Sequence, residues 1–276
     1  TKARLQAALS RSGNSVGAMR ALSQVSPYGQ YQDAFRGIAF YRSVCAMEAL
    51  LAENPEAVTA ELASLTRKLF VRNRMLISIT AERALYDRIA ATLQQALMRL
   101  PEGEEAGMPC VVPFASGREG FTDASSVQYV CRAGNFMDHG FAYTGALRVL
   151  KVILSYDYLW MNVRVKGGAY GCGCNFLRMG EVTYSSYRDP NLAKTDEVYQ
   201  GIPAYIRAFD PDERDMTKYI IGTFSDMDTP MNPEARGTRS LAAYLGHVSE
   251  ETLQRERNQV LYATAADIRA LAELVE

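Results

Sequence analysis

The pattern of hydrophobic and polar positions predicts that the N-terminal part of the chain is mostly helical. Apolar residues recur at helical spacing over residues 31–53, and Asn54, followed by a proline, then marks the capped start of another helix. The period changes to two over residues 75–80, which predicts a strand with one buried face. A closing helix is predicted over residues 82–100.

A single stretch of the chain, residues 101–107, has the composition of a linker, because it combines a proline, glycines and glutamates. We therefore expect two domains, residues 1–103 and residues 104–276. The C-terminal helices repeat the order of the first part only incompletely, and the chain begins at Thr1 without a methionine. Both ends are thus expected to be truncated relative to a larger unit.

The chain beyond the linker alternates in a way that is typical of strands. Strands are predicted at residues 110–114, 126–133, 169–176 and 182–187, the last two forming a hairpin. Between them, helices are predicted at residues 143–154 and 155–166, the second with Ser155 as its N-cap. The class is therefore α+β, with helices packed on one face of a largely antiparallel sheet and one sheet edge left exposed.

The remaining part of the chain is predicted to be helical and carries several start signals. Asn232, Ser249 and Thr264 each have the side chain and the spacing of an N-cap. Pro203 lies inside the helix expected over residues 195–209, where it should kink or shorten that helix.

Charge and cysteine content narrow the class of function. Lys and Arg number 30 against 31 Asp and Glu, so the net charge of −1 gives no electrostatic basis for binding nucleic acid or an anionic membrane surface. No apolar run approaches the ~20 residues of a membrane span. Five scattered cysteines, an odd number, favour free thiols in a reducing compartment.

Candidate metal and nucleophile sites are weak in this sequence. Cys172 and Cys174 could form half of a metal site, but no second pair completes four ligands, and two small buried thiols on one strand face explain them as well. His139 and His247 are not part of a zinc-peptidase motif. We expect no metal site. Residues 13–17 match the Gly-x-Ser-x-Gly nucleophile elbow but lack a preceding strand, so we interpret them as a flexible turn.

The segment richest in candidate chemistry contains Arg164, Gly167, Gly168, Tyr170 and Gly171. The glycines let a backbone or a substrate come close, and no phosphate-binding pattern is present. The arginine and the tyrosine flank that opening, and both can donate hydrogen bonds to a carbonyl or carboxylate. From the residues alone, the favoured interpretation is structural, with Arg164 covering a surface and Tyr170 packed in a core.

This segment also carries a resemblance to a known family. The stretches concerned are residues 134–136 (Gly-Asn-Phe), 154–160, 164–171, 186–192 (Ser-Tyr-Arg-Asp-Pro-Asn-Leu) and 237–240. Together they resemble the C-terminal half of zinc peptidases of the presequence-protease and falcilysin type, in the insulinase (inverzincin) family. The resemblance covers nearly the whole chain and is strongest over residues 133–249.

The resemblance implies a larger enzyme. Such peptidases have four similar α+β domains in two halves that close around an unfolded peptide, and zinc is held by the N-terminal half of the same polypeptide. Residues 1–103 would be the C-terminal part of the third domain and residues 104–276 the fourth, without a cofactor of its own. Arg164 and Tyr170 match the family's donors to the scissile carbonyl, with Gly167, Gly168 and Gly171 beside the substrate.

We therefore expect the non-zinc C-terminal half of a zinc-dependent metalloendopeptidase that degrades oligopeptides, inactive by itself. Its expected partners are its own N-terminal half and unfolded peptides, with no nucleic acid and no membrane. The alternative is a non-catalytic scaffold or binding subunit with the same fold. The expected location is the bacterial cytoplasm, or an organelle if the source is eukaryotic.

Overall fold

The computed structural model describes residues 2–103, 114, 117–122 and 125–276. Their contacts group them into two units. The first unit comprises the described residues of Thr1–Val44, Val111–Asp228 and Leu253–Glu276, and the second those of Cys45–Cys110 and Thr229–Thr252. This grouping does not follow the expected division after residue 103, since the first 44 residues join the chain that follows the linker. Two family domains divided at that residue stay a prediction.

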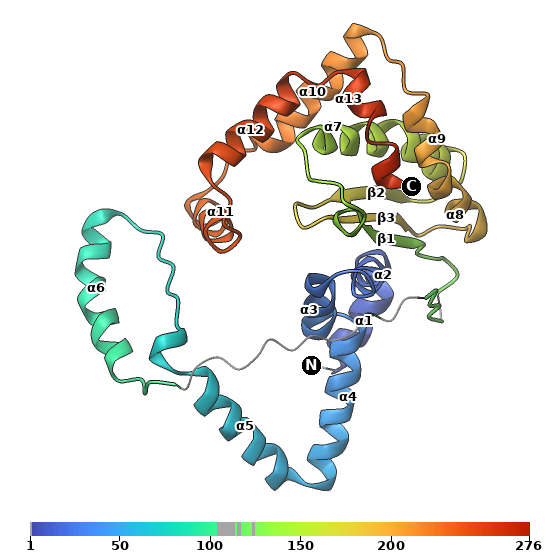
Figure 1. The fold of residues 1–276 in the computed structure, drawn as a ribbon. Coiled ribbons are helices and arrows are strands. Elements are labelled where there is room, and N and C mark those ends of the chain that lie inside the picture. Colours follow the sequence, from blue (N-terminus) through green and yellow to red (C-terminus); the bar gives the residue numbers. More distant parts are fainter. Residues whose placement is uncertain (1, 104–113, 115–116, 123–124) are drawn as a thin grey trace. The chain divides into compact units, whose positions relative to one another are not determined.

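A three-stranded antiparallel sheet lies at the centre of the first unit (Figure 1). Its strands are β1 (Cys131–Asn135), β2 (Gly171–Phe176) and β3 (Glu181–Tyr187), in the order β1-β3-β2. The β2–β3 hairpin is confirmed, and its register pairs Cys174 with Tyr184. Gly180 closes the turn with a φ of +91°, a conformation that glycine adopts at little cost.

β1 begins later than the strand expected over residues 126–133. Gln128 forms an isolated bridge with Asp189, but the N–H of Val130 donates to the Ser186 hydroxyl at 3.1 Å. Because a side chain takes the place of a backbone partner there, the ladder is interrupted before Cys131. The strand expected at residues 110–114 lies outside the described residues, apart from residue 114, which is not in a strand.

Helices cover one face of the sheet, as expected for this α+β class. α7 (Ala146–Ile153) packs against β2, against α10 (Glu213–Met227) and against α13 (Ala265–Arg269). Its side chains Leu147 and Leu150 are fully buried in the core of this unit. The apolar stripe of α7 therefore accounts for its position on the sheet.

The helix of α7 continues without a break into π-helical turns at Leu154–Tyr158 and Trp160–Val165. The prediction that Ser155 caps a new helix is wrong. Leu154 and Leu159 are fully buried and extend the apolar stripe, so packing holds the helix together where the serine would allow a start. The Ser155 hydroxyl instead lies 3.6 Å from the Cys174 sulfur.

The other face of the sheet is contacted by α2 (Gly13–Leu22), which follows α1 (Lys2–Arg11). The interpretation of residues 13–17 as a flexible turn is wrong, since they form the first turns of α2. A Cβ on Gly17 would lie 3.0 Å from the Cys131 sulfur, so the glycine permits close approach to the sheet. A helix precedes the motif where a nucleophile elbow requires a strand.

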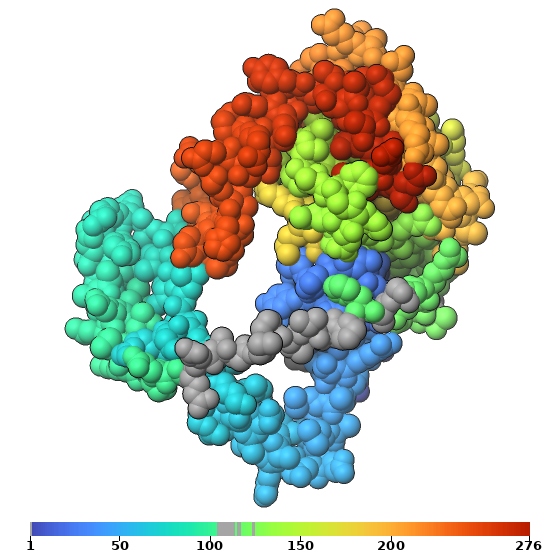
Figure 2. Space-filling model, in the orientation of Figure 1, coloured from blue at the N-terminus to red at the C-terminus, as the bar shows by residue number. Residues whose placement is uncertain are grey.

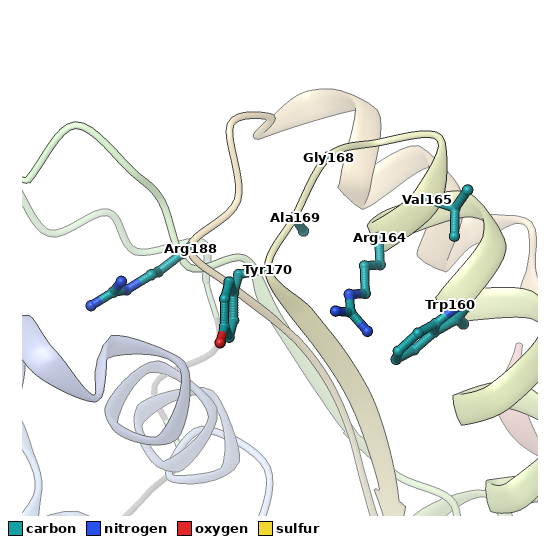
Figure 3. Close-up of a pocket in the computed structure, with 7 residues that line it drawn as sticks. All are labelled: Trp160, Arg164, Val165, Gly168, Ala169, Tyr170 and Arg188. Atoms are coloured by element: carbon teal, nitrogen blue, oxygen red, sulfur yellow. The ribbon is translucent and has the colours of Figure 1, made fainter.

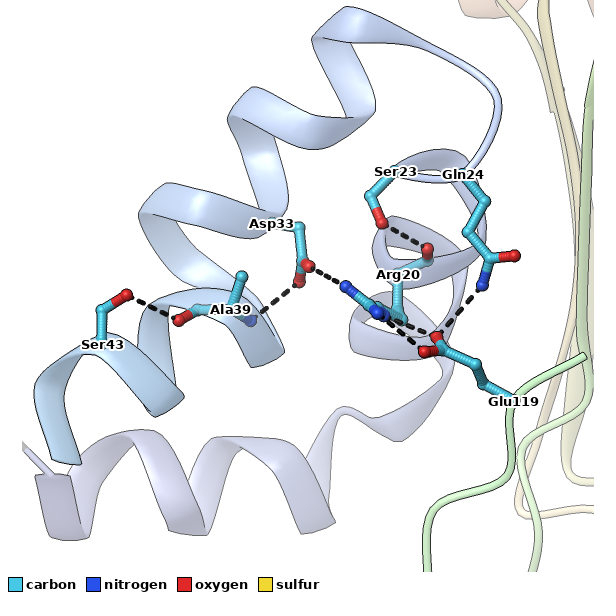
Figure 4. Close-up of polar contacts among 7 residues, drawn as sticks. All are labelled: Arg20, Ser23, Gln24, Asp33, Ala39, Ser43 and Glu119. Atoms are coloured by element: carbon cyan, nitrogen blue, oxygen red, sulfur yellow. Dashed lines mark hydrogen bonds and ion pairs between the residues drawn. The ribbon is translucent and has the colours of Figure 1, made fainter. Parts of the chain in front are cut away.

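Ion pairs fasten α2 to its surroundings in the first unit (Figure 4). Arg20 reaches Asp33 of α3 (Pro27–Arg36) at 2.9 Å and Glu119 at 2.6 Å. The bonds to Glu119 and Asp33 raise the pKa of Arg20 above its usual value. Ser26 is the N-cap of α3, and its hydroxyl accepts from the N–H of Gly29. The same hydroxyl donates to the carboxylate of the buried Glu181 in β3.

The single helix expected over residues 31–53 is interrupted at Gly37, where α3 ends and α4 (Ile38–Glu53) begins. In the second unit, α5 (Pro55–Leu69) starts as expected, with the Asn54 side chain accepting from the N–H of Ala57 at 3.0 Å. Its other helices are α6 (Arg83–Met98) and α11 (Pro233–Leu245).

The strand predicted over residues 75–80 is not formed in the structure. Met75 has extended backbone angles, and Met75, Leu76 and Ile77 are all exposed, so alternate residues here do not form a buried face. An alternating segment becomes a strand only beside another strand, and none pairs with it among the described residues.

The remaining helices agree with their sequence signals. Pro203 is the second residue of α9 (Ile202–Arg207), and α8 (Ala193–Gln200) ends before it, so the helix expected over residues 195–209 is divided. α12 (Glu250–Leu261) follows Ser249, and Thr264 forms a capping box at the start of α13. None of the helices in the described part of the chain is long and apolar enough to cross a bilayer.

Candidate functional site

An open pocket of about 570 Å³ lies where the π-helical segment ends and β2 begins (Figure 3). Its lining consists of Trp160, Arg164, Val165, Gly168, Ala169, Tyr170 and Arg188. The structure thus brings together the arginine and the tyrosine that the sequence singled out. Arg164 lies in the last helical turn and a glycine reversal follows it, as expected. β2 begins at Gly171, so Tyr170, which was expected within the strand, directly precedes it.

Arg164 is held against an aromatic ring. Its guanidinium carbon lies 3.9 Å from the centroid of the Trp160 ring, four residues earlier in the same helix. This cation–π contact restrains the side chain while its N–H donors remain available. It makes no ion pair with a carboxylate of the described residues, so its charge is not neutralised within this site.

The turn between Arg164 and Tyr170 needs both of its glycines. A Cβ on Gly167 would lie 2.4 Å from the Val163 carbonyl oxygen, and Gly168 has a φ of +83°. The turn is closed by the Gly168 N–H, which donates to the Arg164 carbonyl at 2.9 Å. A second bond comes from outside, because the Asn191 amide donates to the Gly167 carbonyl at 2.6 Å.

Tyr170 is exposed, with 68% of its surface accessible, so the prediction of a core tyrosine does not hold. Its ring stands edge-on to Tyr187 with the centroids 5.8 Å apart. The phenol makes no hydrogen bond within the part of the chain that the structure describes. It is therefore a positioned donor without an internal acceptor.

β2 is an edge strand, because among the described strands it pairs only with β3. Its outer N–H and C=O groups are free of strand partners, and glycines occupy the side of β2 that α7 does not cover. A Cβ on Gly173 would meet no atom within 4 Å, and one on Gly171 would come no closer than 3.6 Å to Tyr187. An extended peptide has room at this edge.

Arg188 also lines the pocket, although no pattern in the sequence selects it separately. It follows β3 directly and adopts a φ of 48°, which is uncommon for a residue with a side chain. The next residue, Asp189, is fully buried and accepts from the Thr195 hydroxyl at 2.7 Å. The resemblance motif over residues 186–192 was the available signal, but the backbone strain follows only from tertiary contacts.

The predicted absence of a metal site concerns Cys172 and Cys174 above all. Burial raises the pKa of Cys172 to about 11 and that of Cys174 to about 12, which disfavours the thiolate that binds zinc. No group of three His, Cys, Asp or Glu side chains among the described residues fits a metal ion. His139 lies in a loop after β1, and His247 follows α11 in the second unit, so neither belongs to the pocket.

The pocket therefore presents two guanidinium groups and one phenol, with tryptophan as an apolar wall. Its lining contains no carboxylate, imidazole or thiol that would act as a general base. Such an arrangement binds and polarises an oxygen atom that carries negative charge, at the edge of a strand open to an extended chain.

Comparison with known proteins identifies the family to which this chain is similar. Residues 118–276 match the family model described as the PreP C-terminal domain. The whole chain is 33% identical to 28% of the protein HypA of Clostridium perfringens, over 275 residues. It is also 31% identical to 26% of presequence protease 1, chloroplastic/mitochondrial, of Arabidopsis thaliana. The chain thus spans roughly a quarter of the length of these curated relatives.

Among solved structures, a protease from Helicobacter pylori matches 68% of this chain and 49% of its own, with a TM-score of 0.48 and 15% identity. The family match is independent of that comparison, because it rests on more than half of the chain and includes every residue of the pocket. The chain belongs to the PreP C-terminal domain family.

Proposed function

We propose that this chain belongs to the non-zinc, C-terminal half of a peptide-degrading metalloprotease, in which Arg164 and Tyr170 donate hydrogen bonds to the carbonyl of the bond that is cleaved. The observation that supports it most is that one open pocket holds both donors beside the free, glycine-containing edge of β2. The names of the relatives support a protease, and the short coverage supports an activity that belongs to a longer polypeptide.

The proposed chemistry of these two residues is electrostatic. As a peptide carbonyl is attacked, negative charge grows on its oxygen, and a guanidinium and a phenol favour that charged state over the neutral substrate. One such donor is typically worth about 2.7–4 kcal/mol of transition-state stabilisation. Trp160 and Tyr187 already hold the two side chains, so little rearrangement is needed during the reaction.

The proposed substrate is an unfolded peptide. An extended chain beside β2 would pair with its free N–H and C=O groups, which recognise backbone and tolerate any side chain. Gly171 and Gly173 leave room for that chain, and we place the peptide beside the Gly167–Gly168 turn. A folded protein offers no free strand for this pairing.

The remaining parts of the proposal lie outside this chain. No ligand set among its described residues fits a zinc ion, so we assign the metal to the N-terminal half of the same polypeptide, which is also the proposed partner in closing over the peptide. The free thiols of Cys45, Cys131, Cys172 and Cys174 support a reducing compartment, the bacterial cytoplasm or, in a eukaryote, an organelle.

The test uses the full-length protein that contains this chain. Arg164→Ala and Tyr170→Phe are each expected to lower kcat/KM for a fluorogenic peptide by roughly a hundredfold, at matched zinc content. Arg214→Ala and Tyr156→Phe are the matched controls, because both side chains are exposed and lie outside the pocket. Wild-type rates in both pocket variants would contradict the proposal and favour the non-catalytic scaffold.

A further inference from the structure

Arg188 is the one charged group of the pocket to which the proposed function gives no task. Figure 3 shows its side chain on the opposite side of Tyr170 from Arg164. The guanidinium carbon lies 5.5 Å from the centroid of the Tyr187 ring, and it makes no ion pair within the described residues. It is an exposed cation, restrained by an aromatic ring, and it lines the same pocket with its side chain pointing away from Arg164 (Figure 3).

The backbone at Arg188 is fixed by contacts on both sides. Its carbonyl accepts the N–H of Tyr170 at 3.3 Å, and Asp189 exchanges backbone hydrogen bonds of 2.8 and 2.9 Å with Gln128. The Asp189 carboxylate is buried and accepts from the backbone N–H of Asn191 at 2.8 Å. A positive φ is unfavourable for a residue with a side chain and persists only where such surroundings determine it, as at binding sites.

The charge of the pocket indicates the kind of group that Arg188 would hold. Both charged residues that line the pocket are arginines, and no described carboxylate lines it, so an anion on either side of Tyr170 meets attraction without a competing acid. A carboxylate can accept two parallel N–H bonds from one guanidinium, which a peptide carbonyl cannot. The carboxylates of a peptide are its C-terminus and the side chains of Asp and Glu.

We infer that Arg188 binds a carboxylate of the peptide substrate, displaced along the chain from the bond that Arg164 and Tyr170 address. The inference rests on the proposed function in that it takes a peptide as the ligand. Tyr170 stands between the two guanidinium groups, so the scissile carbonyl and the carboxylate lie on either side of its ring. Arg188 would thus select among peptides and set which bond is placed at Arg164.

The experiment measures binding and cleavage separately in the full-length protein. One peptide sequence is prepared with a free C-terminus, with a C-terminal amide, and with glutamate or glutamine inside it, so that the two sources of carboxylate are distinguished. Dissociation constants are measured by fluorescence anisotropy with EDTA present, and KM and kcat without it. The proteins are wild type, Arg188→Gln, Arg188→Lys, and Arg214→Gln as the matched exposed arginine.

We expect wild type and Arg214→Gln to bind one carboxylate peptide roughly fivefold to tenfold more tightly than its neutral counterpart, as for a partly exposed charge-assisted pair. Arg188→Gln should reduce this ratio towards one, mainly through KM, and Arg188→Lys should retain part of it. Equal binding of charged and neutral peptides by wild type, or a ratio that survives in Arg188→Gln, overturns the inference. Because binding is measured without turnover, a carboxylate preference can stand even if Arg164→Ala shows the proposed function to be wrong.

Discussion

Glu181 is a carboxyl group that the fold buries with little compensation. Only 1% of its surface is accessible; one oxygen accepts from the Ser26 hydroxyl and the other, Oε2, is buried without a partner. Burial raises the pKa of Glu181 above its ordinary value of 4.5, and the hydrogen bond from Ser26 only partly opposes this. The ionised form of Glu181 therefore destabilises the folded state, because its charge is removed from water.

The sign of the resulting pH dependence follows from that raised pKa. Below pH 4.5 the carboxyl is neutral in both states, and no penalty arises. As the pH rises, the unfolded chain ionises first, so stability is lost progressively through the raised folded pKa. Glu181→Gln should raise Tm at pH 8 by about 2–4 °C, the equivalent of roughly 1 kcal/mol in a chain of this size.

Calorimetry or circular dichroism at pH 4 and pH 8 checks this expectation, with the exposed Glu197→Gln as the control. The difference between Glu181→Gln and wild type should shrink towards pH 4. A constant difference at both pH values would show that the effect comes from packing, with no contribution from the charge.

At the residue scale, the sequence predicted some of the site and missed the rest for a physical reason. Arg164 and Tyr170 flank a glycine-rich opening in the sequence, the resemblance implies a role for both, and the structure places them in one pocket. Arg188 was not singled out, because its positive φ depends on the bridge between Gln128 and Asp189, which are far apart in the sequence. Trp160 belongs to a predicted helix and to a stretch of the resemblance, but its contact with Arg164 depends on the helical winding there, which the sequence does not report.

Among the elements, the turn of the β2–β3 hairpin is tied to α12 by a single acidic residue. Arg178 of the turn donates to Glu256 through Nε at 2.7 Å and through Nη2 at 2.6 Å. Glu256 is buried, and Arg148 approaches it at 3.5 Å from α7. This two-bonded pair raises the pKa of Arg178 above its usual value and joins elements far apart in the sequence.

Removing that pair should be destabilising. Glu256→Gln keeps the size of the side chain but leaves Arg178 without an anionic partner, and we expect a loss of about 1–2 kcal/mol, given that Arg178 is partly exposed. Urea unfolding of wild type, Glu256→Gln, Arg178→Gln and the double variant measures the coupling between the two. Additive losses in this cycle would show that the pair contributes nothing as a unit.

A predicted helix or strand is present in the structure where its sequence signal is local, or where the fold places beside it the strand or helix that it needs. The β2–β3 hairpin, the Asn54 cap and the division near Pro203 are confirmed, because each depends on local geometry. The strand predicted over residues 75–80 is absent because no strand among the described residues lies beside it. Ser155 was taken for a cap although buried leucines on both sides continue the helix, a fact about packing that no local signal reports.

At the scale of the whole molecule, the second unit exposes a large number of apolar side chains. Figure 2 draws α5 in cyan, and on that helix Leu62, Leu65 and Leu69 recur on one face and are all exposed. The extended residues 75–77 of the same unit are exposed as well. Contiguous apolar surface of this kind favours association.

We therefore expect the isolated chain to self-associate at concentrations of tens of micromolar, as measured by size-exclusion chromatography with light scattering. The double variant Leu65→Glu and Leu69→Lys should lower the apparent mass. Ala60→Glu with Ala63→Lys, on the opposite face of α5, carries the same charges and should leave the mass unchanged. Equal masses for the two double variants would exclude this face as the cause.

The linker-like composition of residues 101–107 predicted a boundary, yet the first 44 residues group with the sheet that follows it. Contacts across a long sequence separation bring them there, among them Ser26 with Glu181 and Arg20 with Glu119. Composition reports where a chain is free to bend, whereas membership of a unit is decided by which surfaces meet.

The geometry of the site depends on the number of residues in the π-helical segment that precedes the pocket. An α-helix turns by about 100° for each residue, so deleting one residue between Leu154 and Trp160 would rotate everything after it by about that angle unless the helix rewound. The Arg164 side chain would then point away from Tyr170, although every residue of the pocket would still be present. The site is thus encoded in a residue count as well as in residue identities, and a gap of one position can erase it without changing any residue of the pocket.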